Sequence, residues 1–251
     1  MKTITSILII IFACNLQAKE IYATFTVYAE QKADLAFNYS GTINNINVDI
    51  MSRVKKGDVL ATLNSDDLIA TLNISKVTLK YAELAYHRHQ KIFSKKLTDQ
   101  TQLEKYESAY ETIKAKIELE KTILAKTILR APFDGVITQR MIELGDVVSG
   151  QLLKTAFNIQ SEHRRTLVVQ FDQKYNNEVN IGDDFIYKVD GDNREHKGTI
   201  FRIYPAANTN NRKVAVQVAA IDLKVGLFGE GKIIVTEKAL SSATSHTTTP
   251  R

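Results

Sequence analysis

A short glycine-bounded pattern occurs twice in this chain, first in residues 40–60 and again in residues 134–153. Each copy reads as a strand, a turn and a second strand bounded by glycine, which permits the positive φ of tight turns. The matched pairs are Gly41 with Gly135, Ile43 with Ile137, Met51 with Gly145 and Val54 with Val148, and, after a one-residue slip, Gly57 with Gly150 and Leu60 with Leu153. One copy is too small to bury its own apolar face. The two copies are therefore predicted to fold against each other as a split, lipoyl-like β-sandwich.

The segment between the copies predicts an antiparallel coiled-coil hairpin of two helices. It contains no glycine from Asp58 to Asp134, and glycine is avoided in helix interiors. Two series with alternating steps of three and four are separated by a polar stretch at 95–101. The inward positions are Leu68, Leu72, Ser75, Leu79, Ala82, Tyr86, His89 and Phe93, then Leu103, Tyr106, Tyr110, Ile113, Ile117, Glu120, Leu124 and Thr127. Two helices of a larger bundle are the alternative.

A third region, about 165–235, contains short strand-like runs separated by glycine, aspartate and asparagine turns, which predicts a small β-barrel. The expected fold class is thus mostly β, with an inserted α-helical hairpin. The expected boundaries are a signal peptide at 1–18, N-terminal strands with the first lipoyl-like half at 19–66, the hairpin at 67–128, the second half at 129–162, the barrel at 163–236 and a disordered tail at 237–251.

The first eighteen residues resemble an export signal, which places the mature chain in the periplasm. Lys2 gives a positive start, the run from Ile4 to Ala13 is apolar, and 16–18 offer a cleavage site. A retained N-terminal helix is one alternative, and lipidation of Cys14, the single cysteine, is another; either one attaches the chain to the inner membrane.

Composition argues against several functions. The net charge of +5 comes without a dense Lys/Arg block, so no nucleic-acid partner is expected. His87 and His89 lie two residues apart on the predicted helix and point to nearly opposite sides, so they do not make a metal pair. Hydrolase elbows and phosphate loops are missing from the sequence. Neither an enzymatic activity nor a cofactor is expected.

The order of these elements, with the Arg-Ala-Pro-Phe-Asp-Gly run of 130–135 and the Glu-Leu-Gly-Asp-Val-Val run of 143–148, resembles the HlyD-like membrane-fusion, or periplasmic adaptor, family. The matching signature of the first half is Val-Lys-Lys-Gly-Asp-Val-Leu at 54–60. The residues of the lipoyl-like motif are Gly41, Val54, Gly57, Arg130, Ala131, Pro132, Gly135, Gly145, Asp146 and Gly150.

The resemblance implies a homo-oligomer, a trimer or hexamer in assembly, that links an inner-membrane transporter of the resistance-nodulation-division class to an outer-membrane channel protein for efflux of small molecules. An adaptor of an ATP-driven or type I exporter, and a free-standing periplasmic binding or structural module, are the alternatives. The resemblance also implies that an arginine, a leucine and a serine at the hairpin tip contact the channel. Arg88 and Ile92 match the first two places, and the third falls on Thr98 or Asp99. A solvated helix turn without a partner is the alternative for this tip.

Some features depart from the family pattern or leave a choice open. Met51 replaces an expected glycine, which predicts a rebuilt turn, because methionine disfavours positive φ. Gly135 is expected in a turn that valine at this position would strain, so that Gly135→Val misfolds the lipoyl-like domain. Arg130 and Asp134 suggest an ion pair or a turn cap, or a subunit contact through Arg130. Only about 21–32 and 233–240 remain for a membrane-proximal domain.

Overall fold

The computed structural model describes residues 19–152, 154–192 and 194–235. These residues form two compact units, one of residues 31–162 and one in which residues 19–30 join the segment from residue 163 onward. The predicted signal peptide at 1–18, with Cys14, and the predicted tail at 237–251 lie outside the described residues.

The sandwich of the first unit consists of two four-stranded sheets with the orders β2-β9-β7-β4 and β6-β5-β3-β8. The strands are β2 (Lys32–Ala36), β3 (Gly41–Ile46), β4 (Arg53–Val54), β5 (Val59–Leu63), β6 (Ile128–Arg130), β7 (Gly135–Arg140), β8 (Val147–Val148) and β9 (Thr155–Gln160). In each sheet, two central strands from one half are flanked by strands from the other half. Neither half therefore completes a sheet alone, which confirms that the two copies fold against each other.

The backbone hydrogen bonds repeat between the halves. The N–H of Ile43 donates to the carbonyl of Asp146 (2.8 Å), and the N–H of Ile137 donates to that of Ser52 (3.0 Å). Gly145 and Met51 in turn donate to Ile43 (3.0 Å) and Ile137 (2.8 Å). These equivalent hydrogen bonds confirm that the positions matched without a gap, such as Ile43 with Ile137 and Met51 with Gly145, are structurally equivalent.

The closing strands match differently from the prediction. Ala61 faces Ile46 on β3, whereas Phe157 faces Arg140 on β7, so Ala61 corresponds to Phe157. Leu60 consequently takes the place of Ala156, and not of Leu153, which lies outside the described residues. The reason is that the connection from β8 to β9 is longer than the one from β4 to β5.

The repeat also begins earlier than the sequence indicated, because β2 and β6 occupy equivalent edge places beside β9 and β5. The two sheets enclose one core of buried apolar side chains. Its members with almost no exposed surface include Ile43, Leu60, Leu63, Ile137, Phe157 and Ile159.

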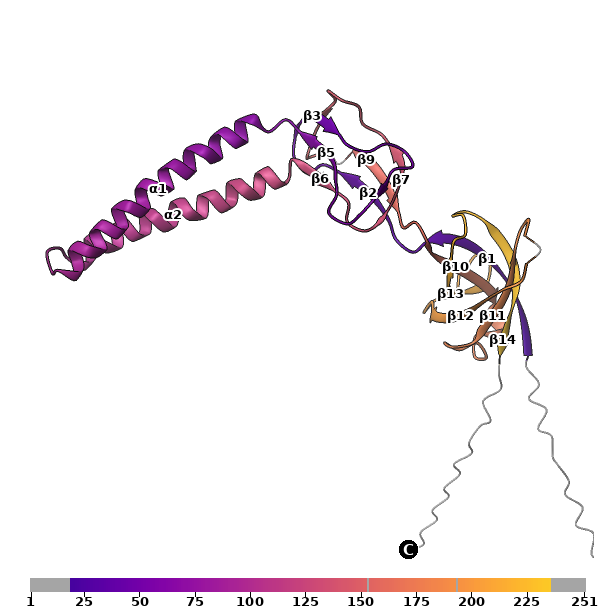
Figure 1. The fold of residues 1–251 in the computed structure, drawn as a ribbon. Coiled ribbons are helices and arrows are strands. Elements are labelled where there is room, and N and C mark those ends of the chain that lie inside the picture. The colour runs from indigo at the N-terminus through magenta and orange to yellow at the C-terminus, as the bar shows by residue number, and fades with distance from the viewer. Residues whose placement is uncertain (1–18, 153, 193, 236–251) are drawn as a thin grey trace, which may run out of the picture. The chain divides into compact units, whose positions relative to one another are not determined.

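The insertion is a hairpin of two long helices, α1 (Asp66–Ser94) and α2 (Gln100–Ala125), which lie side by side (Figure 1). Every predicted inward position except Phe93 is buried or half-buried. Phe93 is instead 37% exposed, and Ile92 next to it is half-buried. The seam therefore shifts by one residue in the last turn of α1.

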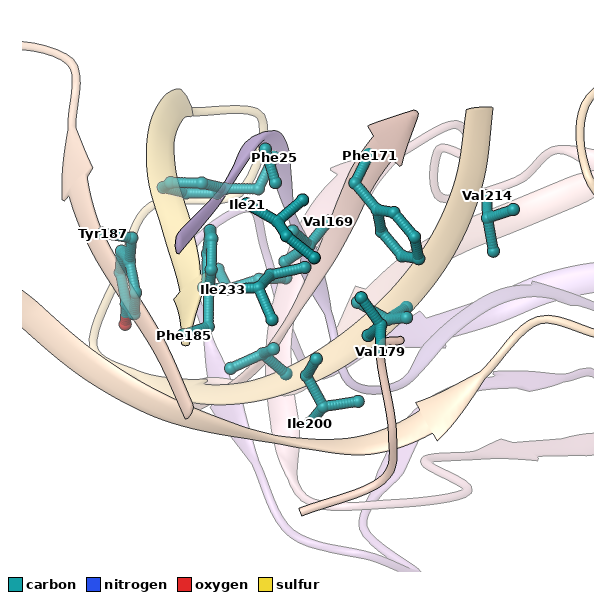
Figure 2. Close-up of a cluster of buried hydrophobic side chains, with 14 of the residues drawn as sticks. Ile21, Phe25, Val169, Phe171, Val179, Phe185, Tyr187, Ile200, Val214 and Ile233 are labelled. Carbon is teal, nitrogen blue, oxygen red and sulfur yellow. The ribbon is translucent and has the colours of Figure 1, made fainter. Parts of the chain in front are cut away.

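The second unit is a closed six-stranded antiparallel barrel with the order β1-β10-β13-β12-β11-β14. The strands are β1 (Lys19–Ala29), β10 (Arg164–Asp172), β11 (Asp184–Val189), β12 (His196–Ile203), β13 (Lys213–Ile221) and β14 (Phe228–Val235), with a short 3-10 helix η1 (Gln173–Tyr175) after β10. Figure 2 shows the apolar side chains that fill its interior, among them Phe25, Phe171 and Phe185.

The segment at 19–29 belongs to this barrel and not to the sandwich with which it was grouped. Strand β1 pairs with both β10 and β14 and closes the barrel. Ile21 and Ile233, both from segments expected to remain for a further domain, are buried in the barrel core. Alternation of buried and exposed residues along β1 fits a strand with one face on that core.

Candidate partner-binding site

The hairpin tip is a tight turn of residues 95–99 between the two helices. Lys96 N–H donates to the carbonyl of Phe93 (2.8 Å), which closes α1, and Lys96 itself has a φ of 57°. At the other side of the turn, the Asp99 carboxylate accepts the N–H of Gln102 (2.8 Å) and caps α2. An aspartate at this place satisfies a free donor of the first helical turn.

The four residues expected at the tip lie in different environments. Arg88 is exposed on α1, and no side-chain hydrogen bond or ion pair joins it to another described residue. Ile92, one helical turn further, and Thr98 are half-buried. Asp99 is exposed, but its carboxylate has the capping role. The structure therefore gives one of the two candidates for the third place a structural function.

The tip is positively charged. Lys91, Lys95 and Lys96 are exposed close to Arg88 along the chain. Such a surface can donate charge-assisted hydrogen bonds to carboxylates while Ile92 and the exposed Leu97 offer apolar contact. This combination suits recognition of another protein.

Polar residues inside the hairpin face one another across the seam. The Ser75 hydroxyl donates to Glu120 (2.9 Å), and Lys116 lies 3.8 Å from the same carboxylate oxygen. The His89 and Tyr106 rings stack with a centroid distance of 3.7 Å. The Thr127 hydroxyl, the fourth polar inward group, donates to the carbonyl of Leu124 (2.7 Å).

One turn geometry recurs through the lipoyl-like halves and the barrel. In each case the third residue has positive φ, and the fourth accepts the N–H of the first through its side chain. The turns are Asp49–Ser52, Lys55–Asp58, Glu143–Asp146 and Asn180–Asp183, with third residues Met51 (68°), Gly57 (93°), Gly145 (87°) and Gly182 (99°). The turn at Met51 is therefore not rebuilt, contrary to expectation. The side chain of Met51 is 75% exposed, so the strained backbone meets no steric obstacle from packing.

Gly135 and Gly150 are needed for close approach, not for positive φ. A Cβ on Gly135, at the start of β7, would lie 2.3 Å from the carbonyl oxygen of Gln160, and one on Gly150 would lie 2.8 Å from the backbone of Asn38. A larger residue at Gly135 is therefore unfavourable, as expected, but the cause is this close contact and not the strain of a turn. At Gly41, the equivalent position, the nearest atom would be 3.4 Å away.

The remaining motif residues hold the return from the hairpin. Arg130 donates to the carbonyl of Gly57 (2.9 Å), and Asp134 accepts the N–H of Lys56 (2.7 Å). Both cap the Lys55–Asp58 turn, as one of the alternatives held. Ala131 and Val54 are buried in the sandwich core, whereas Pro132 is exposed.

A cation that the sequence did not single out joins the two equivalent turns. Arg140 donates to Glu143 (2.7 Å) and to Asp49 (3.1 Å). The hydrogen bond from the N–H of Ile50 lowers the pKa of Asp49 most, and the hydrogen bond from Arg140 lowers it further. The hydrogen bond to Glu143 raises the pKa of Arg140. The sequence feature that could have indicated this contact is the acidic residue, Asp49 or Glu143, at the first position of each of the two equivalent turns.

No group of three or more histidine, cysteine, aspartate or glutamate side chains gathers as a metal site within the described ranges. Neither of the two long helices, nor any other helix in the described part of the chain, carries an apolar stretch long enough to span a bilayer.

The architecture of a split sandwich, an inserted helical hairpin and a small barrel is that of the membrane-fusion, or adaptor, proteins. Residues 31–159 match the family model described as the CzcB-like, barrel-sandwich hybrid domain, and the chain belongs to this family. No curated protein sequence matches the chain.

Solved structures agree on the fold. A MacA-MexA chimera that contains the α-hairpin domain of Pseudomonas aeruginosa MexA is 21% identical, with a TM-score of 0.80 over 87% of this chain and 82% of that one. The membrane fusion protein Spr0693 from Streptococcus pneumoniae R6 is 14% identical, with a TM-score of 0.71 over 87% of this chain and 100% of that one. MacA from Actinobacillus actinomycetemcomitans is 21% identical, with a TM-score of 0.59 over 87% of this chain and 79% of that one.

Proposed function

We propose that this chain is a periplasmic adaptor that links an inner-membrane transporter of the resistance-nodulation-division class to an outer-membrane channel for the efflux of small molecules. The observation that carries the proposal is the hairpin tip, where Arg88 projects from the end of a two-helix arm without a partner among the described residues. The adaptor assembles as a homo-oligomer, a trimer or hexamer. Its role is connective, and the proposal assigns it neither a catalytic step nor a cofactor.

The physical basis of the proposal is that different parts of the hairpin have different roles. The seam holds the two helices together, and the tip leaves cationic and apolar groups exposed. A channel protein with carboxylates at the end of its own helices is the complementary partner. Docking uses Arg88 and Ile92, with Thr98 or Asp99 at the third place.

The test is in-cell crosslinking from a photoreactive residue at Ile92, with the same residue at Lys76 as the matched control. Lys76 is also exposed on α1 but lies in the half of the helix away from the tip. We expect the outer-membrane channel to be captured from position 92 and not from position 76. Equal capture from both positions, or no capture by a folded periplasmic protein, contradicts the proposal.

The class of transporter is tested separately by copurification from membranes after gentle crosslinking. Recovery of a resistance-nodulation-division pump supports the proposal. Recovery of an ATP-driven exporter in its place keeps the adaptor role and overturns the pump assignment.

A further inference from the structure

A pocket with a positively charged lining opens at one end of the barrel. It lies between η1, which follows β10, and the loop that joins β12 to β13, and its volume is about 720 Å³. Its cationic lining residues are Lys174, Arg212 and Lys213, and Asp172 is the one carboxylate among the described lining residues. The pocket therefore carries an excess of positive charge.

The charges of this pocket are unequally balanced. The Asp172 carboxylate accepts the N–H of Lys174 (3.0 Å), which caps η1, and it lies 3.8 Å from Nζ of the same lysine. Within the described part of the chain, no hydrogen bond or ion pair joins the side chains of Arg212 and Lys213 to the protein. A guanidinium and an ammonium group without a counter-charge favour an anionic ligand, and a guanidinium suits the paired oxygens of a phosphate group.

The loop holds Arg212 in an unfavourable backbone conformation beside η1. The N–H of Arg212 donates to the carbonyl of Asn208 (2.8 Å), and its own carbonyl accepts the N–H of Gln173 (3.1 Å). Its φ is 53°, in the left-handed region that glycine adopts without strain and arginine does not. The turn itself therefore gives no reason for an arginine at this place, whereas the pocket gives one.

The other lining residues add neutral donors and apolar surface. The hydroxyl of Tyr204 accepts a hydrogen bond from Gln217 (2.9 Å), which leaves its own proton to donate. Asn176 and Asn211 bring side-chain amides to the lining, and Pro205 brings an apolar ring. The volume falls within the range of roughly 300–1,000 Å³ that is usual for small-molecule pockets. The pocket thus has room for a larger group beside a phosphate.

The pocket lies at the end of the barrel where β1 begins and β14 ends. Lys19 pairs with Val235 at this end, and Nζ of Lys19 lies 5.0 Å from the ring centroid of Tyr175, whose two chain neighbours line the pocket. Residues 1–18, for which a retained helix or a lipidated Cys14 is the alternative to cleavage, join the chain at the same end. A membrane attachment there would bring phospholipid headgroups to the pocket.

We propose that this pocket binds the phosphate group of an anionic ligand, either a phospholipid headgroup or a soluble phosphate ester. Arg212 and Lys213 pair with the phosphate oxygens, and the hydroxyl of Tyr204 and the amide of Asn211 donate to those that remain. The inference goes beyond the proposed function, because the site lies on the barrel and does not involve the hairpin tip.

The test measures binding of the full chain to two probes. Cosedimentation compares phosphatidylcholine vesicles with vesicles of equal parts phosphatidylcholine and phosphatidylglycerol, and calorimetric titration uses inorganic phosphate at constant ionic strength. Binding that requires phosphatidylglycerol, without binding of inorganic phosphate, assigns the headgroup. Binding of inorganic phosphate without vesicle binding assigns a soluble ligand. Either result, or both together, supports the site.

Arg212→Gly is the decisive variant, because it removes the guanidinium and leaves a residue that suits the positive φ. We expect the affinity for the bound probe to fall by at least about tenfold, with a melting temperature that is unchanged or raised. The matched control is Lys224→Gln, which removes one positive charge from an exposed loop between β13 and β14 at the opposite end of the barrel. This control should keep the affinity of the native chain.

Three results would overturn the inference. The first is a native chain that binds neither probe. The second is an equal loss of affinity in the two variants, which would show that the net charge of the chain and not this pocket attracts the anion. The third is an unchanged affinity in a folded Arg212→Gly variant.

Discussion

At the residue scale, Met51 shows how a turn can keep its geometry with an unfavourable residue. Its φ of 68° lies beside the values of 87° to 99° for the three glycines at the same place in the related turns. The backbone hydrogen bonds from both sides, Met51 to Ile137 and Ile137 to Ser52, define the turn. The sequence revealed the missing glycine, but it could not show that pairing with the other half overrides the local preference.

Exchanging the residues of the two equivalent turns should move stability in opposite directions. Met51→Gly should raise the free energy of unfolding by up to about 1 kcal/mol, because release of the left-handed strain outweighs the added freedom of the unfolded chain. Gly145→Met should lower it by about 1 kcal/mol for the converse reason. Urea unfolding measures both. If both substitutions changed the free energy of unfolding by the same amount in the same direction, the positive φ would not be what determines the stability of these turns.

Gly135 and Gly41 form a second matched pair. We expect Gly135→Ala to destabilise the sandwich by about 3 kcal/mol, since its Cβ would overlap the carbonyl oxygen of Gln160. Gly41→Ala should cost less than about 1 kcal/mol, because its nearest neighbour lies at an ordinary contact distance. Thermal melting of both variants measures the two losses of stability. A similar loss in both variants would refute the close-approach explanation. The sequence marked Gly135 but not this reason, which involves a strand distant along the chain.

Arg88 is the residue on which the proposed tip function depends. Arg88→Asp should abolish export while leaving the melting temperature unchanged, because the side chain is exposed and has no bond to another described residue that could be lost. Lys76→Asp, the same charge change in the other half of α1, should retain export. Cellular accumulation of an exported dye measures both. Normal efflux in the Arg88 variant would remove this residue from the site.

At the element scale, periodicity predicted the hairpin well. Almost all inward positions were correct because the three-four spacing is a local property of each helix. The match of the closing strands was wrong because loop length, which local patterns do not fix, decides the register.

The carboxylate of Glu120, which accepts a hydrogen bond from Ser75, lowers the stability of the seam, because one oxygen of this half-buried group is buried without a partner among the described residues. Ser75→Ala should destabilise the hairpin by about 1–3 kcal/mol, since it removes the hydroxyl donor from Glu120. Ser75→Ala with Glu120→Leu should recover that loss and exceed the native stability by about 1 kcal/mol, because an apolar pair needs no desolvated charge. Helical circular dichroism on heating measures both. Additive losses in the double variant would show that the carboxylate stabilises the seam.

At the scale of the whole molecule, the barrel unit is built from two separate segments of the chain, and the other unit is inserted between them. Strand β1 begins the described chain in the barrel, residues 31–162 then form the sandwich and hairpin, and the chain returns to the barrel from residue 163. The sequence grouped residues 19–29 with the following strands because nothing local marks a partner that lies more than a hundred residues away. Long-range strand pairing is the part of this fold that patterns along the sequence do not reveal.

Two compact units with separate cores should unfold as two transitions, each sensitive to its own core. Phe25, on β1, packs edge-to-face against Phe185 at a centroid distance of 5.8 Å in the barrel (Figure 2). Phe25→Ala should lower the barrel transition by about 3–5 kcal/mol and leave the other in place, because a buried ring is replaced by a cavity. Phe157→Ala, which removes a buried ring from the sandwich core, should do the reverse. Differential scanning calorimetry of the full chain distinguishes the two. If either substitution shifts both transitions equally, the units are thermodynamically coupled, and the barrel is not an independent unit completed by β1.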